Sequence, residues 1–122
     1  MGGGEYPGDY YGGGTEGISC TSIEISDGIE TIGNEVFCEN QFDYIELPAT
    51  LKSIGSYCFR NANTVSPSMN IVFKSINTDI DQDCFSDTNG IDISVFGYEG
   101  STIKNYIEQL NNSNIMFQLK ED

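Results

Sequence analysis

The chain has 122 residues, which is room for one domain, and its 5 lysine or arginine residues face 19 aspartate or glutamate residues. The resulting formal charge of −14 repels phosphate backbones and anionic lipid, so binding to nucleic acid or membranes is not expected. Histidine is absent, which excludes Ser-His-Asp and Cys-His catalytic groups. No apolar run approaches the roughly 18 residues of a membrane-spanning helix.

Residues 1–17 contain eight glycines and show no apolar periodicity. A segment of this kind loses much conformational entropy on folding and buries little surface in return. We predict a flexible linker or an artificial leader here. The alternative is an adhesive segment built on Tyr6, Tyr10 and Tyr11.

An internal repeat follows the tail. Ser22–Phe37 aligns with Tyr44–Phe59 without a gap, a third copy spans Asn70–Phe85, and a partial fourth copy begins at Asp92. The predicted strand starts are Ile23, Ile45, Ile71 and Ile93. Each copy has a short strand of alternating apolar residues, a turn and a second apolar segment. One copy cannot bury its apolar side alone, so we predict a right-handed solenoid with a parallel sheet.

The strand alternation predicts which side chains point outward from this sheet. The three outward ladders are Ser22, Tyr44, Asn70 and Asp92; Glu24, Glu46, Val72 and Ser94; and Ser26, Pro48, Lys74 and Phe96. Tyr44, Val72 and Phe96 place apolar area on this polar face, as protein interfaces do. Cross-strand pairing that only stabilises the sheet is the alternative.

The four cysteines lack any CxxC spacing, so a zinc or thioredoxin-type site is not expected. Cys58 and Cys84 take the small inward position before phenylalanine and are predicted to be buried thiols, as is Cys20. A Cys58–Cys84 disulfide is the alternative, but the insertion before the third copy leaves its geometry open. Cys38 follows Phe37 and is expected to be exposed.

An acidic run occupies the turn of the third copy, where Asp79, Asp81 and Asp83 alternate as at the start of a calcium loop. The sixth position of that loop, which requires glycine, is Cys84, and the twelfth is Gly90 instead of glutamate. We therefore predict a solvated turn, with weak calcium binding by Asp79–Asp87 left open. No metal site and no cofactor is predicted.

The carboxy-terminal residues predict a helix followed by a strand. Ser101 is suited to cap the helix, whose apolar face repeats at i, i+3, i+4 and i+7 with Ile103, Tyr106, Ile107 and Leu110. Asn111 and Asn112 can end it, and Ile115, Phe117 and Leu119 alternate as a final strand. The opposite end has no comparable cover, so we expect the chain to be the carboxy-terminal piece of a longer repeat protein; Ile18 and its neighbours acting as a cap is the alternative.

The segments SIEISDGIETIGNEVF and YIELPATLKSIGSYCF resemble the BspA-like (Treponema pallidum-type) leucine-rich repeat, I-x-I-P-x-x-V-x-x-I-G-x-x-A-F. The closing segment VFGYEGSTIKNYIEQLNNSNIMF is similar to the carboxy-terminal cap of that family, and the resemblance covers about residues 18–119. The third copy departs from the pattern at Asn77 and Asp81. The resemblance implies an α/β leucine-rich-repeat solenoid of about four short parallel strands, with a tail (1–17), repeats (18–97) and a helix-strand cap (98–122).

We predict a non-enzymatic interaction module, because a solenoid offers extended surfaces and few pockets. The candidate binding residues are Tyr44, Glu24, Glu46, Val72, Lys74 and Phe96. Glu24 and Glu46 would be adjacent like a glycosidase pair, but a shallow face gives no means of raising one pKa. The family resemblance implies an extracellular or cell-surface adhesin with a protein or glycan partner. A structural spacer or cap, and an accessory domain of a surface enzyme, stay open.

Overall fold

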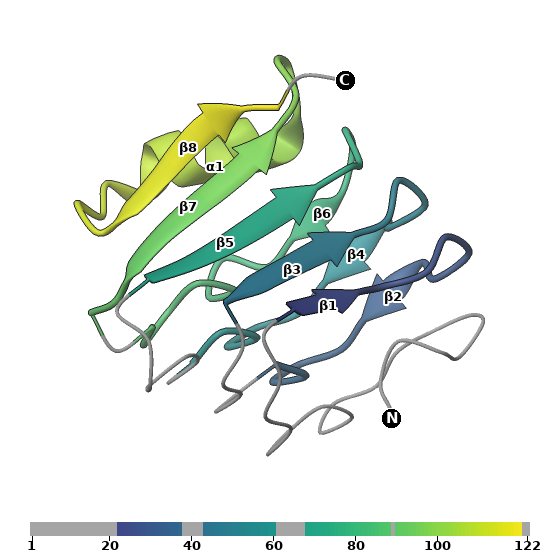
Figure 1. Ribbon diagram of the computed structural model, residues 1–122, viewed down its shortest axis with the longest axis horizontal. Helices are drawn as coiled ribbons and strands as arrows, with labels where there is room; N and C mark the ends of the chain where they lie inside the picture. The colour runs from purple at the N-terminus through teal and green to yellow at the C-terminus, as the bar shows by residue number, and fades with distance from the viewer. Residues whose placement is uncertain (1–21, 38–42, 61–67, 89, 121–122) are drawn as a thin grey trace.

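The computed structural model describes residues 22–37, 43–60, 68–88 and 90–120, and the predicted tail of residues 1–17 lies outside them. Five strands form the larger sheet in the order β1, β3, β5, β7 and β8 (Figure 1). Their bounds are Ser22–Glu24, Tyr44–Leu47, Ser68–Phe73, Asp92–Gly97 and Ile115–Leu119. Every neighbouring pair is parallel, which confirms the predicted solenoid of stacked repeats.

A second, smaller parallel sheet forms the other layer (Figure 1). Its strands are β2 (Thr31–Ile32), β4 (Ser53–Ile54) and β6 (Asp79–Ile80). Each of the first three turns of the solenoid, called rungs below, therefore gives one strand to each sheet. The sequence predicted the second apolar segment of each copy but not this sheet, because two-residue strands are too short to show an alternating pattern.

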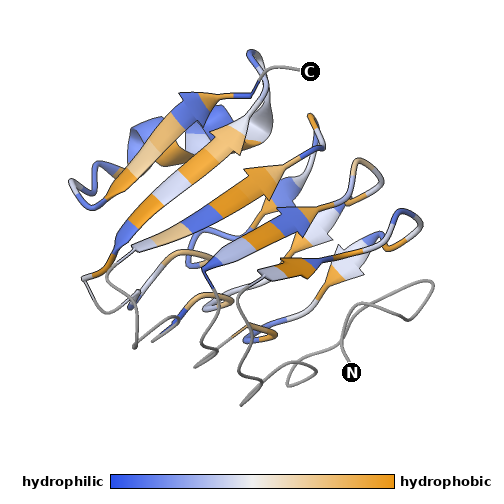
Figure 2. Cartoon of the chain, viewed as in Figure 1, coloured by the Kyte–Doolittle hydropathy of each residue, from blue (hydrophilic) through white to orange (hydrophobic). Residues whose placement is uncertain are grey.

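The core lies between the two sheets and is built from equivalent residues of successive rungs. Figure 2 shows apolar and polar residues alternating along β3, as a sheet with one buried face requires, whereas the second half of β5 is continuously apolar. The Phe37 ring stacks on Phe59 with a centroid separation of 5.6 Å, and Phe59 stacks on Phe85 at 4.9 Å. Cys58 and Cys84 are fully buried beside this stack, as predicted. Cys20 and Cys38 lie outside the described residues.

The pairing of β5 with β7 corrects the predicted alignment of the fourth copy. Ile71 pairs with Val95, whereas the sequence alignment placed Ile71 beside Ile93. Ile93 instead pairs with Met69, and both side chains are buried. The fourth copy is thus displaced along the sheet by one full step of the alternation. The alignment failed because Ile93 and Val95 both fit a two-residue period, so the pattern alone could not select one register.

The third rung keeps the backbone pattern of the second despite its departures from the repeat. The Asp81 amide donates to the Ile54 carbonyl at 3.1 Å, as the Gly55 amide donates to Ile32 at 2.9 Å. The side chain of Thr78 donates to the Leu51 carbonyl at 2.9 Å and adds a further link between these rungs. The substitution of glycine by aspartate therefore leaves the stacking intact.

The helix α1 (Thr102–Leu110) follows its predicted signals. The Ser101 hydroxyl accepts a hydrogen bond from the Lys104 amide at 3.2 Å, and Asn111 ends the helix in the left-handed conformation with φ 56°. Ile103 and Ile107 are buried against the core. The helix covers the end of the core beyond the third rung, and β8 extends the larger sheet beside β7.

Tyr106 of α1 takes the place that the phenylalanine of another rung would occupy. Its ring lies 5.7 Å from the Phe85 ring, centroid to centroid. Its hydroxyl donates to the Gln82 carbonyl at 2.9 Å and accepts from the Phe85 amide at 3.3 Å. Burial raises the pKa of Tyr106 to about 12. This one side chain supplies both the ring contact and the hydrogen bonds that close the stack.

Candidate functional site

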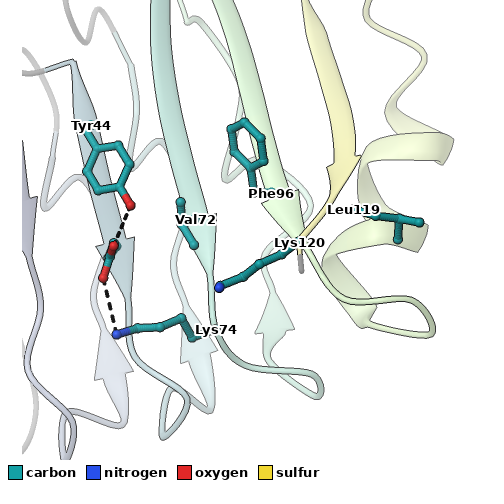
Figure 3. A pocket seen from close by; sticks show the side chains of 7 residues that line it. Tyr44, Val72, Lys74, Phe96, Leu119 and Lys120 are labelled. Carbon is teal, nitrogen blue, oxygen red and sulfur yellow. Dashed lines mark hydrogen bonds and ion pairs between the residues drawn. The ribbon is translucent and has the colours of Figure 1, made fainter. Parts of the chain in front are cut away.

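The outer face of the larger sheet carries a shallow hollow of about 420 Å³ where β3, β5 and β7 lie side by side (Figure 3). Five of the six predicted binding residues line it. The complete lining is Tyr44, Glu46, Val72, Lys74, Phe96, Leu119 and Lys120. The parallel pairing brings these positions together although they come from four different strands, or directly follow one as Lys74 and Lys120 do, and from both halves of the chain.

The floor of the hollow is apolar because the true register places Phe96 beside Val72. The sequence alignment had placed Phe96 beside Lys74, two positions further along, and that prediction was wrong for the reason given above. Val72 points away from the core, yet only 7% of its surface is exposed. The sequence predicted apolar area from Tyr44, Val72 and Phe96 on this face, and a valine covered by its neighbours gives that area a desolvated centre.

A hydrogen-bonded network forms one wall. The Tyr44 hydroxyl donates to Glu46 Oε2 at 2.5 Å, and Lys74 Nζ lies 3.3 Å from Glu46 Oε1 (Figure 3). The hydrogen bond to Glu46 raises the pKa of Tyr44 to about 12, and the same bond lowers the pKa of Glu46. Glu46 is therefore held as a carboxylate whose lone pairs already have donors, and it orients the tyrosine ring above the sheet.

Glu24 is the predicted residue that does not line the hollow. It pairs with Glu46 across β1 and β3, and its side chain is 70% exposed. Lys74 Nζ lies 3.7 Å from Glu24 Oε2, so one ammonium group pairs with both carboxylates and the three groups together keep one negative charge. A glycosidase acid needs a raised pKa, and the pKa of Glu46 is lowered. The arrangement suits an ion pair better than a pair of catalytic acids.

Lys120 was not among the predicted residues, and it gives the hollow its charge. Four other cations of the described chain, Lys52, Arg60, Lys74 and Lys104, have a carboxylate within 4.0 Å. Within the described ranges, Lys120 Nζ forms no ion pair and lies 5.7 Å from the centroid of the Tyr98 ring. Sequence reasoning placed Lys120 in the cap because the neighbours of β8 could not be known from its own residues.

Leu119 lines the margin of the hollow. Its side chain points away from the other lining residues (Figure 3) and is 56% exposed. It belongs to β8, which pairs with β7, so the carboxy-terminal strand completes a site that the repeats begin. The sequence predicted Leu119 only as one residue of an alternating final strand and did not place it at this site.

The acidic turn does not form a metal centre in the part of the chain that the structure describes, where no group of three or more acidic, cysteine or histidine side chains could hold an ion. Asp81 Oδ1 accepts from the Asp83 amide at 2.9 Å, and Asp83 Oδ1 accepts from the Ser86 hydroxyl at 3.1 Å. These carboxylates therefore satisfy local donors. No helix among the described residues is long and apolar enough to cross a membrane.

A larger hollow of about 590 Å³ lies over the smaller sheet. It is lined by short strands and their turns, with Asp79 and Asp81 as its charged side chains. Ile32 and Ile54 of its lining are buried core residues, no aromatic side chain is among its described lining residues, and no cation there offsets its acids. The hollow over the larger sheet is therefore the stronger candidate for recognition.

Stacked parallel rungs with an extended side-chain surface define a solenoid repeat protein, a class that generally binds other proteins. Residues 16–118 match the family model described as the BspA-type leucine-rich-repeat region (6 copies). The chain therefore belongs to that family. This repeat is typically non-enzymatic. No curated protein and no solved structure matches the chain.

Proposed function

We propose that this protein is a secreted or cell-surface module that binds another protein through the hollow over β3, β5 and β7. The observation that carries the proposal is the hollow itself, in which Val72 is almost fully covered while Tyr44 and Phe96 flank it. Interface hot spots are enriched in aromatic side chains around desolvated centres. The surface location is supported by the family, whose members are generally secreted or surface proteins of bacteria.

The hollow fits a partner side chain that is apolar and has a carboxylate nearby. Phe96 supplies an apolar contact area beside the covered Val72, and Lys120 supplies an ammonium group without an ion pair inside the described chain. Lys74 is already neutralised by Glu46 and Glu24. The recognised element is therefore an aliphatic or aromatic residue beside an acidic one, presented by a protein whose other residues tolerate the strongly acidic surface of this chain.

A glycan is the second candidate partner, because Tyr44 and Phe96 offer aromatic faces to a sugar ring. The absence of a raised carboxylate pKa at Glu46 favours binding over hydrolysis in that case as well. If no binding is found, two alternatives remain: a spacer or cap that binds nothing, or an accessory domain of a surface enzyme.

The experiment is binding of the labelled full chain to an array of extracellular-matrix proteins, host receptors and glycans. Saturable binding is expected, and Tyr44→Ala/Phe96→Ala should weaken it at least tenfold, as loss of a hot spot does. Met116→Ala is the matched control, because Met116 is 59% exposed on the neighbouring β8 and lines no part of the hollow. Circular dichroism confirms that each variant is folded.

The charge of the partner is tested with a second matched pair. Lys120→Gln and Lys52→Gln each remove one positive charge, but Lys52 directly precedes β4 of the smaller sheet and pairs with Glu30 at 3.6 Å. Lys120→Gln should weaken binding by about twofold to fivefold, the range of an exposed ion pair, and Lys52→Gln should not. Equal effects of the two variants would assign the attraction to net charge and contradict a carboxylate at the hollow.

A further inference from the structure

Two buried cysteines lie side by side in the core, on the second and third rungs. Each follows an isoleucine of the smaller sheet at the same spacing, Ile54 or Ile80, and these isoleucines pair directly. The stacking continues past the strands, since the Tyr57 amide donates to the Asp83 carbonyl at 2.9 Å. The residues inserted between the second and third copies therefore leave the stacking of the two rungs intact.

The two thiols occupy equivalent positions of adjacent rungs. Both residues are completely buried, and the Cys58 thiol donates to the carbonyls of Gly33 at 3.2 Å and Gly55 at 3.4 Å. Adjacent parallel rungs are about 4.8 Å apart, which lies within the 4.4–6.8 Å separation of Cα atoms that a disulfide spans. The sequence left this geometry open because it could not show where the inserted residues go.

We propose that Cys58 and Cys84 form a disulfide when the chain folds in an oxidising medium, and that this bond cross-links the second and third rungs. The reaction needs an oxidant, and a small-molecule disulfide such as oxidised glutathione is sufficient. The inference is independent of the hollow on the outer face, because the two sulfurs lie between the sheets.

The exchange proceeds in two balanced steps. The Cys58 thiolate attacks one sulfur of the oxidant, forms a mixed disulfide and releases one glutathione thiolate. Cys84 then loses its proton and attacks the Cys58 sulfur, which releases the second glutathione. The neighbouring Cys84 lowers the pKa of Cys58, and burial raises the pKa of Cys84, which favours Cys58 as the first thiolate; attack by Cys84 first gives the same disulfide. Two thiols are oxidised and one small disulfide is reduced to two thiols.

Complete burial determines when the bond can form. A thiol with no exposed surface reacts slowly with a dissolved oxidant, so oxidation is expected during folding and not after it. The bond closes the whole loop of chain from Cys58 to Cys84, which includes the segment between the second and third copies. Closing a loop that spans one complete rung should raise the melting temperature by about 10 °C relative to the reduced protein.

The test is to refold the full chain with oxidised and reduced glutathione, block free thiols with iodoacetamide and digest with trypsin. Cleavage after Lys52, Arg60, Lys74 and Lys104 places Cys58 in peptide 53–60 and Cys84 in peptide 75–104, with Cys20 and Cys38 together in peptide 1–52. A linked pair of 53–60 and 75–104, about 2 Da lighter than the two thiol peptides, is expected. Reductant should separate the pair and lower the melting temperature.

Recovery of both peptides as separate alkylated species from folded protein would overturn the proposal, as would a link from either one to peptide 1–52. Cys58→Ala is the control, because it should lose the linked pair and the rise in melting temperature together. Should oxidative refolding yield no folded protein, the folded reduced chain is incubated with oxidised glutathione in mild denaturant, where the two rungs open transiently. Absence of the linked pair there would equally overturn the proposal.

Discussion

The second rung and the carboxy-terminal end of the solenoid bury apolar side chains against different kinds of neighbour. The second rung lies between two near copies of itself, so Phe59 stacks on a phenylalanine at both faces. The end has no following copy, and Tyr106 of a helix replaces the next phenylalanine. A rung inside the solenoid therefore packs well whenever its register matches that of its neighbours. The end of the solenoid instead needs particular side chains, such as Tyr106, that cover the last ring and bond to the backbone groups of the last rung.

The hydrogen bonds of the two regions also differ. Several backbone amides and carbonyls link the second rung to the first, as Gly55 does to Ile32, and the Ser56 amide adds a bond to Asn34 Oδ1 at 2.9 Å. At the end, the Thr102 amide donates to the Ile76 carbonyl at 2.9 Å, and side chains add further bonds: the Thr102 hydroxyl donates to the Thr78 carbonyl at 2.6 Å, and Tyr106 bonds to Gln82 and Phe85. Substitutions in the second rung should consequently disturb the whole stack, and those at the end should act locally.

The largest effect is expected at the centre of the stack. Phe59→Ala removes a ring with no exposed surface that two other rings contact, and should lower the free energy of unfolding by about 3–5 kcal/mol. Urea denaturation followed by circular dichroism measures the change. A loss below about 1 kcal/mol would mean that the rungs rearrange freely, which contradicts a fixed register.

Substitutions at two glycines allow a direct comparison of the second rung with the carboxy-terminal end. A Cβ atom at Gly55 would lie 2.8 Å from backbone atoms of Gly33 and Asn34, whereas at Gly97 it would meet the side chains of Ile103 at 2.9 Å and Phe117 at 3.0 Å. Side chains can move aside and a stacked backbone cannot. Gly55→Ala should therefore cost about 3 kcal/mol and Gly97→Ala about 1 kcal/mol, measured in the same denaturation experiment. The reverse order would show that the cap is the more rigid region.

A smaller, local effect is expected from Tyr106→Phe. This change keeps the ring contact with Phe85 and removes the hydroxyl that bonds to Gln82 and Phe85, at a cost of about 1 kcal/mol. Hydrogen exchange should become faster at the Phe85 amide and stay unchanged at the Gly55 amide in the second rung. Faster exchange at both positions would instead indicate that the end and the second rung unfold together.

The smallest effect concerns the outer face. Glu46→Gln should return the pKa of Tyr44 from about 12 toward its ordinary value of 10, because the carboxylate that raises it is lost. Tyr106 is the control, because its pKa is also about 12 but burial is the main cause. NMR titration of tyrosine labelled at Cζ resolves the two residues. A pKa of Tyr44 that stays near 12 in the variant would show that Glu46 is not the cause.

The sign of the linked stability change follows from these shifts. The pKa of Tyr44 is raised on folding, so its stabilising contribution is fully present below pH about 10 and is lost as the pH rises toward 12. The pKa of Glu46 is lowered, so its contribution is present above the ordinary value of 4.5 and is lost as the pH falls below it. Glu46→Gln should flatten the pH dependence of stability in both ranges.

Much of the candidate site followed from the repeat alone. Tyr44, Glu46, Val72, Lys74 and Phe96 were all placed on the outer face, because a period of two residues decides which side of a strand faces the core. The apolar floor did not follow, because the register of Phe96 depends on which of two buried pairs forms between β5 and β7. The sequence could not predict Lys120 as part of the site, because its position relative to the other lining residues depends on the pairing of β8 with β7.

By itself, the sequence determined the stacking of parallel rungs, the family and the cap with its helix signals, since these depend on residues close together in the chain or on a strict repeat. Only the tertiary structure decided the second sheet, the register of the fourth copy, the ammonium group at the hollow and the stacking of the rungs that carry Cys58 and Cys84. The physical reason is that a local pattern selects which face of a segment is buried, whereas packing against a distant partner selects which residues meet there.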